Sequence, residues 1–409
     1  MKKLLTLTTI LFFVFSACTE ESPVETNNVD LHDDIQKILT KHHDVYLADY
    51  PNYIGGYALQ VKSPKGNYFV TAGMNQDVTN QSHFRAASNT KTFTSAAIHL
   101  LHDKGLLNVH HKIIDIIPGT TEPYIPDTPE YNIPYKDEIT IWQLLSHNAG
   151  AFDVTNDNIP LDVTADVPYK GQNYSDYKLN EEPNRTFTFD EFIGVISTCK
   201  LSYFQPGTGH HYSNNGFSLL GKIIERISGK SYQQFLMDEF VIPLGLTETT
   251  FPDQGDDQTI PTHAVTGYIQ EPGATPTDVT ESNMSANVAE GNVLTTADNL
   301  SEFIKLLLTG NAGVSLTTIN NIMMDCRLSS SGSSAGYGGG LIHWNNLGYG
   351  HNGGHEGFLS LMVYDPETDI AIVGYTNSLN LINGSSSIME TLTSLEEVFR
   401  EVKATVVGN

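Results

Sequence analysis

A serine and a lysine three residues apart, Ser88 and Lys91, could form a nucleophile with its activator. Apolar residues recur at helical spacing over 93–101, so the pair lies at the start of an amphipathic helix and shares one face of it. A serine hydroxyl is a weak nucleophile near neutral pH, and a desolvated amine can take its proton. Backbone N–H groups at a helix start can stabilise an oxyanion. The spacing predicts a catalytic serine; a helix-capping serine beside a solvated lysine is the alternative.

A tyrosine and an asparagine two residues apart form a second candidate pair. Tyr212 and Asn214 follow a glycine-containing turn at 204–211 and precede an apolar helix predicted over 217–227. A phenol beside a lysine can carry protons, and an asparagine can both donate and accept hydrogen bonds to a substrate amide. Because Tyr-x-Asn also occurs elsewhere in this chain, the interpretation depends on this context.

A third candidate segment, 350–357, places glycines around a histidine just before a predicted strand. Glycines before a strand let a substrate backbone approach and pair along the sheet edge. His351 could assist proton movement or supply electrostatic stabilisation. The alternative is a glycine-rich turn that carries surface histidines.

The elements that must position these residues are strands near both ends of the chain and helices between them. This order predicts an α/β (α+β) fold, in which both termini build one antiparallel sheet flanked by helices and a mostly helical subdomain is inserted at about 106–290. The hydrolase domain as a whole is expected over 31–404. The strands are expected at 57–61, 68–71, 337–344, 358–364 and 370–375, and the main helices at 31–47, 88–101, 141–146, 217–227, 232–240, 296–308, 316–324 and 392–402.

The stretch 153–184 is polar, aromatic and without periodicity. Loops of this length are uncommon in compact domains unless they serve a function. We therefore interpret it as a lid or a wall of a site.

Six motifs in one order resemble the serine β-lactamase-related family, which groups class C β-lactamases, DD-carboxypeptidases, D-amino-acid amidases and peptidases, and some esterases. The resemblance covers about 31–400, nearly the whole chain after its first segment, and implies a β-lactamase/transpeptidase-like fold. The motifs are Phe-Arg-x-x-Ser-x-x-Lys at 84–91, Leu-Leu-Ser-His-Asn-Ala-Gly at 144–150, Pro-Gly-Thr-x-x-x-Tyr-Ser-Asn at 206–214, Pro-Leu-Gly-Leu-x-x-Thr at 243–249, Thr-Thr-Ala-Asp-Asn-Leu at 295–300 and Gly-His-Asn-Gly-Gly at 350–354.

The resemblance implies catalytic roles for three residues: Ser88 is acylated, Lys91 is the base, and Tyr212 protonates the leaving group and later activates water. It implies substrate contacts from Asn214 and from the segment His351, Asn352 and Gly353, which stands where lactamases carry Lys-Thr-Gly. The backbone N–H groups of Ser88 and Gly354 would form the oxyanion hole. The reaction is a two-step acyl transfer without a cofactor.

Two departures from the family pattern bear on the substrate. Asn352 replaces the usual threonine or serine, and Gly354 lacks a side chain, so hydroxyls that help to hold a carboxylate are absent. An efficient β-lactamase is therefore disfavoured, and a neutral or ester substrate is credible. The leading expectation is an enzyme that resembles D-alanyl-D-alanine carboxypeptidases and D-peptidases. The alternatives are an esterase, a β-lactamase, and a covalent penicillin-binding receptor without turnover.

The overall charge narrows the classes of partner. With 22 basic and 47 acidic residues, the net charge is −25, so nucleic acid is excluded as a partner because phosphate binding needs a basic surface. The sequence has no Cys-x-x-Cys or His-Glu-x-x-His, which argues against a metal site. Cys199 and Cys326 could form a disulfide or remain thiols.

The first residues read as a targeting segment. Residues 1–17 carry two lysines and then an apolar run too short to span a membrane, which is typical of a signal peptide. Small residues before Cys18 resemble a bacterial lipobox, which implies lipidation at Cys18, a polar tether at 18–30 and a membrane-anchored lipoprotein of the cell envelope. Ordinary secretion with cleavage nearby is the alternative.

Two other serines compete with Ser88. Ser334 lies in Gly-x-Ser-x-Gly at 332–336, but an α/β-hydrolase elbow needs a strand before it and a helix after it. A serine-rich stretch precedes Ser334, so we interpret the segment as a loop. Ser197 and Lys200 repeat the Ser-x-x-Lys spacing without a downstream partner in family order, and we interpret them as structural.

Overall fold

The computed structural model describes residues 31–261, 263–328 and 335–408. The predicted signal peptide at 1–17, the tether with Cys18 and the competing Ser334 lie outside the described residues. Within the described ranges, no helix has both the length and the apolar character needed to cross a membrane.

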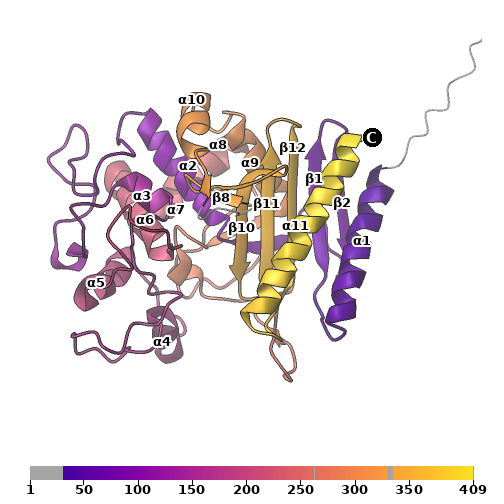
Figure 1. Ribbon diagram of the computed structural model, residues 1–409, viewed down its shortest axis with the longest axis horizontal. Coiled ribbons are helices and arrows are strands. Elements are labelled where there is room, and N and C mark those ends of the chain that lie inside the picture. Colours follow the sequence, from indigo (N-terminus) through magenta and orange to yellow (C-terminus); the bar gives the residue numbers. More distant parts are fainter. Residues whose placement is uncertain (1–30, 262, 329–334, 409) are drawn as a thin grey trace, which may run out of the picture.

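The described chain is built around an eight-stranded antiparallel sheet with strand order β2-β1-β12-β11-β10-β9-β8-β7 (Figure 1). β1 pairs with β12 and so joins the two ends of the chain, which confirms the predicted fold class. The strands are β1 (Tyr57–Ser63), β2 (Gly66–Ala72), β7 (Arg327–Leu328), β8 (Ala335–Tyr337), β9 (Ile342–Trp344), β10 (Gly348–His355), β11 (Phe358–Asp365) and β12 (Ile370–Thr376).

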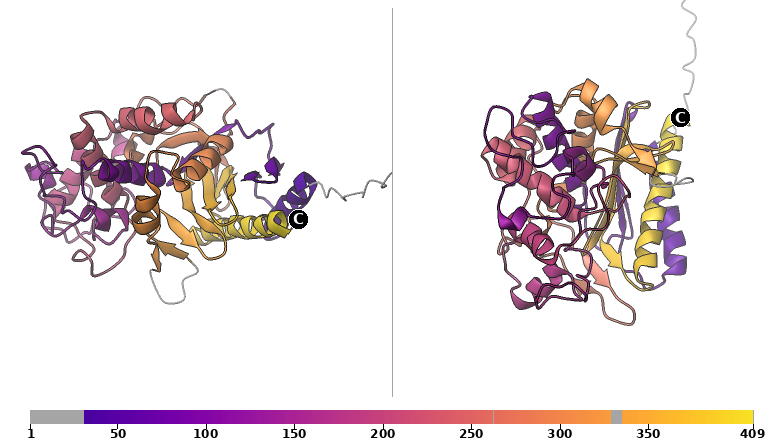
Figure 2. Two further views of the ribbon diagram at one scale, coloured as in Figure 1. Left: turned by 90° about the horizontal axis from the view of Figure 1, so that it is seen from above. Right: turned by 60° about the vertical axis from the view of Figure 1, so that its left-hand side comes forward.

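Helices cover both faces of this sheet because its central strands bury side chains on both sides (Figure 2). Along β11, Leu361 and Val363 pack in the cluster under α1 (Leu31–Asp49) and α11 (Ser385–Gly408). The alternate residues Met362 and Tyr364 face the larger core, where α9 (Ala297–Leu308) packs on β11 and β12.

The remaining helices lie on the left in Figure 1 and share the larger core with the sheet. They include α2 (Thr90–Asp103), α3 (Ile141–Leu145), α4 (Tyr174–Glu181), α5 (Phe189–Cys199), α6 (Asn214–Ser228), α7 (Tyr232–Leu236), a π-helical turn (Met237–Val241) and α8 (Ile242–Leu244). Near the sheet edge, α10 (Leu316–Thr318) continues into a second π-helical turn (Ile319–Met323). Short pieces complete the chain: the 3-10 turns Pro129–Tyr131 and Met284–Asn287, the pair β3 (His83–Ala87) and β6 (Val293–Thr296), and β4 (Tyr268–Gln270), β5 (Thr277–Asp278) and β13 (Ser378–Asn380).

Three local predictions were wrong. The single strand expected at 337–344 is the hairpin β8–β9, because Gly340 adopts a φ of +72° in the turn between them. The segment 350–357 was expected to lie before a strand, but most of it forms strand β10, which pairs with β11. The stretch 153–184 is not wholly irregular, since it contains α4, whose start is capped by Asn173.

The second Ser-x-x-Lys pair is structural, as predicted. Ser197 Oγ donates a hydrogen bond to the carbonyl of Pro129, and Lys200 Nζ donates one to the carbonyl of Asn132. Cys199 and Cys326 do not form the disulfide that the sequence left open, and both are free thiols.

Candidate active site

Ser88 lies in the tight turn between β3 and α2, one residue before the helix cap. The turn requires a left-handed backbone at Ala87, with φ of +51°, which a residue with a side chain adopts only at a cost. Asn89 offsets that cost by donating hydrogen bonds to the Ala86 carbonyl at 2.8 Å and to Ser360 Oγ on β11 at 2.9 Å. The serine is therefore presented on a rigid corner of the sheet.

Lys91 reaches from the first turn of α2 to the serine, as the three-residue spacing predicts. Its Nζ lies 3.3 Å from Ser88 Oγ and 2.7 Å from Asn214 Oδ1. The other two neighbours belong to Glu290: the backbone carbonyl at 2.9 Å and the carboxylate Oε2 at 3.2 Å. Lys91 is fully buried. Burial alone would lower the pKa of Lys91, but the negative charges that Tyr212 and Glu290 can carry outweigh it and raise the pKa.

Tyr212 closes the triangle with the serine and the lysine. Its ring centroid lies 4.7 Å from Lys91 Nζ, and both Lys91 and Ser88 are close enough to lower the pKa of its phenol. Burial raises the pKa of Tyr212, and the opposing effect of the Lys91 charge reduces that shift without reversing it. The ring packs on His147 with centroids 4.3 Å apart. The structure thus brings the three predicted catalytic residues together.

Asn214 is the first residue of α6 rather than part of a turn, and its position is fixed on three sides. Its backbone N–H donates to Asp153 Oδ2 at 2.9 Å, and its Nδ2 donates to Thr155 Oγ1 at 3.1 Å. Its Oδ1 accepts from Lys91. One N–H of the side-chain amide remains for a substrate carbonyl.

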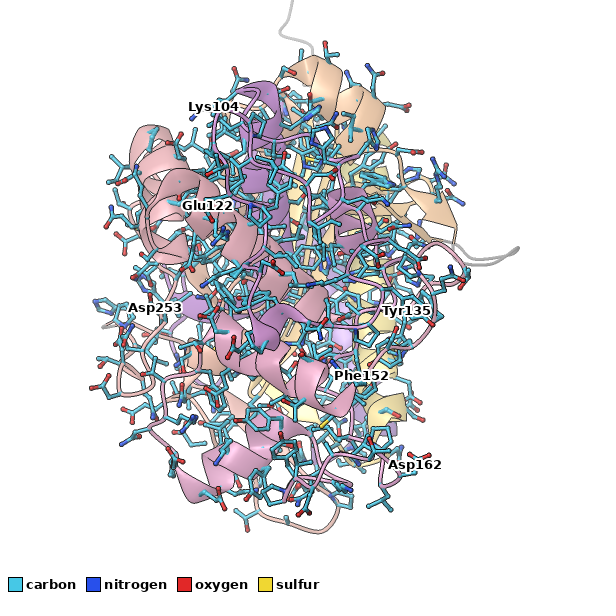
Figure 3. All side chains as sticks on the ribbon, turned by 90° about the vertical axis from the view of Figure 1, so that its left-hand side faces the viewer. Lys104, Glu122, Tyr135, Phe152, Asp162 and Asp253 are labelled. Carbon is cyan, nitrogen blue, oxygen red and sulfur yellow. The ribbon has the colours of Figure 1, made fainter. Side chains whose placement is uncertain are left out.

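The cavity in front of Ser88 has a volume of about 380 Å³, and Tyr212, Asn214 and Gly354 also line it. The predicted oxyanion-hole residues Ser88 and Gly354 therefore share this cavity. The stretch 153–184 forms one wall of it through Thr155, Asn156, Ser175, Asp176 and Leu179. Figure 3 faces the helical side of the molecule and shows Asp162, from the same stretch, at its lower edge.

His351, Asn352 and Gly353 do not belong to the cavity lining. His351 belongs to β10, and its buried side chain places Nε2 3.0 Å from the Tyr337 hydroxyl. Burial first, and then the charge of Lys91, lower the pKa of His351 to about 3, so its imidazole is neutral at physiological pH. Gly353 has a steric role: an added Cβ would lie 2.3 Å from the Ala86 carbonyl oxygen. Only glycine lets β10 approach the Ser88 corner this closely.

The ionisable groups that line the cavity are acidic, apart from Tyr212 and His355. Asp176, Glu290 and Glu356 are carboxylates, whereas no lysine or arginine is among the lining residues of this cavity. Burial first, and then the charge of Arg85, lower the pKa of His355 to about 4, so His355 adds no positive charge. Glu356 stands at the mouth, where desolvation on its protein-facing side and then the charge of Asp176 raise its pKa. The cavity therefore carries carboxylates and neither lysine nor arginine among its lining residues.

Two carboxylates of the site were not predicted from the sequence. Glu290 contacts Lys91 from 199 positions away, and Asp153 holds the backbone of Asn214 from 61 positions away. Neither residue lies at a sequence spacing from its partner that would predict the contact. Among the described residues no cluster of histidine, cysteine and carboxylate side chains could hold a metal ion.

A family model described as Beta-lactamase matches residues 50–384 of this chain. Penicillin-binding protein 4* of Bacillus subtilis is 26% identical over 295 residues, which are 69% of this chain and 58% of that protein. Protein flp of Staphylococcus aureus strain N315 is 25% identical over 356 residues, 85% of this chain and 63% of that protein. The chain thus spans less than two thirds of the length of either relative.

Among solved structures, the D-amino acid amidase of Ochrobactrum anthropi SV3 complexed with D-phenylalanine superposes with a TM-score of 0.70 at 22% identity, covering 93% of this chain and 100% of that one. The D-stereospecific amidohydrolase of a Streptomyces species gives a TM-score of 0.68 at 24% identity, covering 88% of this chain and 97% of that one. At these identities the likeness shows a shared fold.

Proposed function

The chain belongs to the beta-lactamase family of serine hydrolases, and from that premise we propose that it hydrolyses amides and peptides of D-amino acids whose amino group is free. The observation that carries the proposal is the charge of the cavity. Asp176 and Glu356 line the same cavity as Ser88, no lysine or arginine is among the lining residues, and Lys91 is already paired with Glu290.

The reaction proceeds in two steps. Ser88 Oγ attacks the substrate carbonyl carbon, its proton passes to the Lys91–Tyr212 pair, and the N–H groups of Ser88 and Gly354 stabilise the oxyanion. Tyr212 protonates the departing amine as the C–N bond breaks, which leaves an ester on Ser88. Water then attacks this ester, gives its proton to Tyr212, and releases the acid while Ser88 regains its hydroxyl hydrogen.

This proton path orients the substrate. We place the leaving amine beside Tyr212 and the acyl group near Glu356 and Asp176, which line the same cavity. An ammonium on the acyl group would meet two carboxylates there, whereas a carboxylate would be repelled. The D-configuration is supported by the amidase and the amidohydrolase that share the fold, whose titles name D-phenylalanine and D-stereospecificity.

The test compares D-alanine p-nitroanilide with its N-acetyl and L-alanine counterparts. We expect kcat/KM for the free D-amine to exceed that for the N-acetyl compound by at least about tenfold, because tenfold corresponds to ~1.4 kcal/mol, the size of one partly screened charge contact. Glu356→Gln and Asp176→Asn should reduce this preference for the free D-amine. Glu239→Gln is the matched control, because Glu239 pairs with Lys104 and does not line the cavity. Equal turnover of the acetylated compound would reject the proposal.

A second candidate is the D-alanyl-D-alanine carboxypeptidase. A cavity of about 470 Å³ lies beyond Tyr337, on the leaving-group side, and Arg327 lines it with a side chain that is 77% exposed. Its guanidinium could meet the terminal carboxylate of a departing D-alanine. Release of D-alanine from N-acetylated peptides, lost in Arg327→Ala, would favour this activity. A stable penicillin adduct without any turnover would instead indicate a covalent receptor.

We also propose that residues 31–404 form the hydrolase domain and that lipidation at Cys18 anchors it to the cell envelope through the tether at 18–30. The residue pattern at 1–18 supports this. Incorporation of labelled palmitate into the expressed protein, abolished by Cys18→Ala, is the expected result. A mature protein that is unlabelled and released by the cell would contradict it.

A further inference from the structure

A second cavity, of about 340 Å³, lies between the start of α5, the middle of α6 and the start of α7. Among the described residues it shares no lining residue with the cavity in front of Ser88. Asp253, which belongs to its lining, is labelled on the left of Figure 3. We call it the α5–α7 cavity; the lining residues that matter below are Phe187, Phe189, Glu225, Tyr232, Asp253 and Val288.

Aromatic side chains form the walls of the α5–α7 cavity. Phe187 and Phe192 stack with ring centroids 5.2 Å apart, and Phe189 meets Tyr232 edge to face at 6.4 Å. All four side chains are at most 8% exposed, yet each lines the cavity. The faces of such rings attract cations and pack against apolar groups. The walls therefore suit a ligand with an apolar body and a positive charge.

The charged groups of the α5–α7 cavity are unequal in number. Lys222 lies 2.8 Å from Asp190 and so already has a partner. Two further carboxylates, of Glu225 and Asp253, line the same cavity. Burial is the main cause that raises the pKa of Glu225, and the nearby charges of Asp190 and Asp253 add to it. The Tyr232 N–H and Lys222 oppose this shift without reversing it. A bound cation would compensate the excess of negative charge.

Two helices begin at this cavity, and the N–H groups of a helix start attract anions. Both starts are already capped. Thr188 Oγ1 accepts a hydrogen bond from the Glu191 N–H at 3.2 Å at the start of α5. Ser231 Oγ accepts one from the Gln234 N–H at 3.2 Å at the start of α7. The first turn of α5 also carries the carboxylates of Asp190 and Glu191, so an anionic ligand is disfavoured.

The segment 282–291 belongs to the walls of both cavities. Val288 lines the α5–α7 cavity, whereas Asn287 and Glu290 line the cavity in front of Ser88. Asn287 Nδ2 donates a hydrogen bond to Glu290 Oε1 at 2.8 Å, which joins the two residues on the active-site side. A ligand that contacts Val288 therefore acts on the same short segment that supplies Glu290.

Tyr232 provides a second connection between the cavities. Its hydroxyl lies 2.7 Å from Thr94 Oγ1, and Thr94 donates a hydrogen bond to the Ala289 carbonyl at 2.6 Å. Because Thr94 has one hydroxyl hydrogen and gives it to a carbonyl, Tyr232 is the donor to Thr94. Ala289 has a φ of +70°, an unfavourable conformation that these contacts hold. The next residue, Glu290, contacts Lys91 Nζ through its carbonyl at 2.9 Å and its carboxylate at 3.2 Å.

We propose that the α5–α7 cavity binds a primary ammonium ion with an aromatic or aliphatic body, and that this ligand activates the enzyme. A ligand packed against Tyr232 and Val288 stabilises the turn at Ala289, so that Glu290 stays in contact with Lys91 for a larger share of the time. This inference does not depend on which acyl donor the proposed function assigns.

Binding is tested by isothermal titration calorimetry near neutral pH with 2-phenylethylamine, 2-phenylethanol and phenylacetate, which have similar shapes. The amine should bind at least about tenfold more tightly than the alcohol, because only the ammonium is attracted by Glu225 and Asp253, and phenylacetate should bind most weakly. Glu225→Gln, which can keep the contact with the Tyr232 N–H, and Asp253→Asn should remove this preference. Glu239→Gln is the matched control, because Glu239 pairs with Lys104 outside the cavity. Equal binding of amine and alcohol, or tightest binding of phenylacetate, would overturn the proposal.

An amine can also meet the carboxylates that line the cavity at Ser88, and a double variant separates the two sites. Asp176→Asn with Glu356→Gln changes lining residues of the Ser88 cavity alone, so it should leave the Glu225-dependent binding unchanged. Amine binding that is lost in this double variant and kept in Glu225→Gln would place the ligand in the active site and overturn the proposal.

Activation is tested as kcat/KM for 4-nitrophenyl acetate, which carries no charge. This ratio reports acylation of the enzyme, so later capture of the acyl group by the amine does not affect it. Saturating 2-phenylethylamine should raise kcat/KM by about fivefold, the lower end of ordinary coupling between sites. Tyr232→Phe keeps the ring and removes the contact with Thr94, so it should bind the amine without being activated. No activation of the wild-type protein, or equal activation of Tyr232→Phe, would overturn the proposed coupling.

Hydrogen–deuterium exchange gives a measurement that needs no catalysis. Bound 2-phenylethylamine should slow exchange in the peptide 284–291, and an unchanged exchange rate there at saturation would also overturn the proposal. Failure of the proposed function would look different: no acyl adduct would form on Ser88, as seen by intact mass with Ser88→Ala as the reference, while the amine would still protect 284–291.

Discussion

Replacing Asp153 by asparagine should destabilise the protein and disable the site in one step. The carboxylate is 1% exposed, and every contact it makes is with a hydrogen-bond donor. Oδ1 accepts from the Thr155 N–H at 3.0 Å, the Thr155 hydroxyl at 2.6 Å and the Asn156 N–H at 3.1 Å. Oδ2 accepts from Asn156 Nδ2 at 3.0 Å and the Asn214 N–H at 2.9 Å.

An asparagine of the same shape cannot satisfy these donors in either orientation. If its oxygen takes the Oδ1 position, its NH2 faces the Asn214 N–H; if it is flipped, its NH2 faces three donors. Rotation of the Asn156 amide relieves one clash and leaves at least one buried donor unpaired. A lost hydrogen bond to a charged group is worth about 1.5–3 kcal/mol, so we expect the free energy of unfolding to fall by about 3 kcal/mol.

The same change should lower kcat/KM by about a hundredfold, because Asn214 would shift and Lys91 would lose its shortest contact. Urea unfolding followed by circular dichroism measures the stability, and hydrolysis of D-alanine p-nitroanilide measures the activity. Asp162→Asn is the matched control, since Asp162 is exposed on the same stretch. If Asp153→Asn unfolds at the wild-type urea concentration and keeps its activity, the hydrogen-bond reasoning is wrong.

Three further outcomes follow from the same structure. Gly353→Ala should lose activity and stability, because its Cβ would lie 2.3 Å from the Ala86 carbonyl oxygen. Gly194→Ala in α5 is the comparison: its Cβ meets nothing closer than 3.7 Å, so this substitution should stabilise the protein by about 1 kcal/mol, and thermal unfolding compares the two variants. His351 has a pKa of about 3 in the folded protein and about 6.5 in the unfolded chain, so the unfolded state binds more protons between these pH values. The free energy of unfolding therefore falls as pH drops, by about 1.4 kcal/mol per pH unit, and His351→Gln should flatten this slope in urea titrations from pH 6.5 to 4. Added salt should reduce kcat/KM for a cationic D-amino-acyl anilide and leave the N-acetyl compound unaffected, because screening acts on the carboxylates at the mouth; equal effects on both would contradict the charge argument.

The parts of the site that the sequence predicted are those governed by local spacing or by a motif. Ser88 lies in the turn just before α2 and Lys91 in its first turn, so their contact follows from a short separation at the helix start. Tyr212 and Asn214 were found because the turn and the helix around them form a recognisable segment. The pairing of strands from the two termini was predicted because strands occur near both ends of the chain and helices between them.

The errors came where tertiary contacts overrode local preference. Glycine is a poor strand former, so Gly350, Gly353 and Gly354 suggested a turn, yet pairing with β11 and the close approach to Ala86 place them in β10. Glu290 could not be predicted at all. Its contact with Lys91 depends on a left-handed Ala289, a conformation that alanine does not favour and that only the packing against α2 enforces.

Charge connects the buried pair with the choice of substrate. Had Lys91 stood without Glu290, the ammonium would give the cavity a positive centre that attracts carboxylates, as a peptide C-terminus or a penicillin would supply. With Glu290 in contact, the positive charge is cancelled where it arises, and the field at the mouth is that of Glu356 and Asp176. The Glu290 carboxylate therefore fixes Lys91 and also leaves Asp176 and Glu356 as the charges that, in the proposed function, favour an acyl donor with an ammonium.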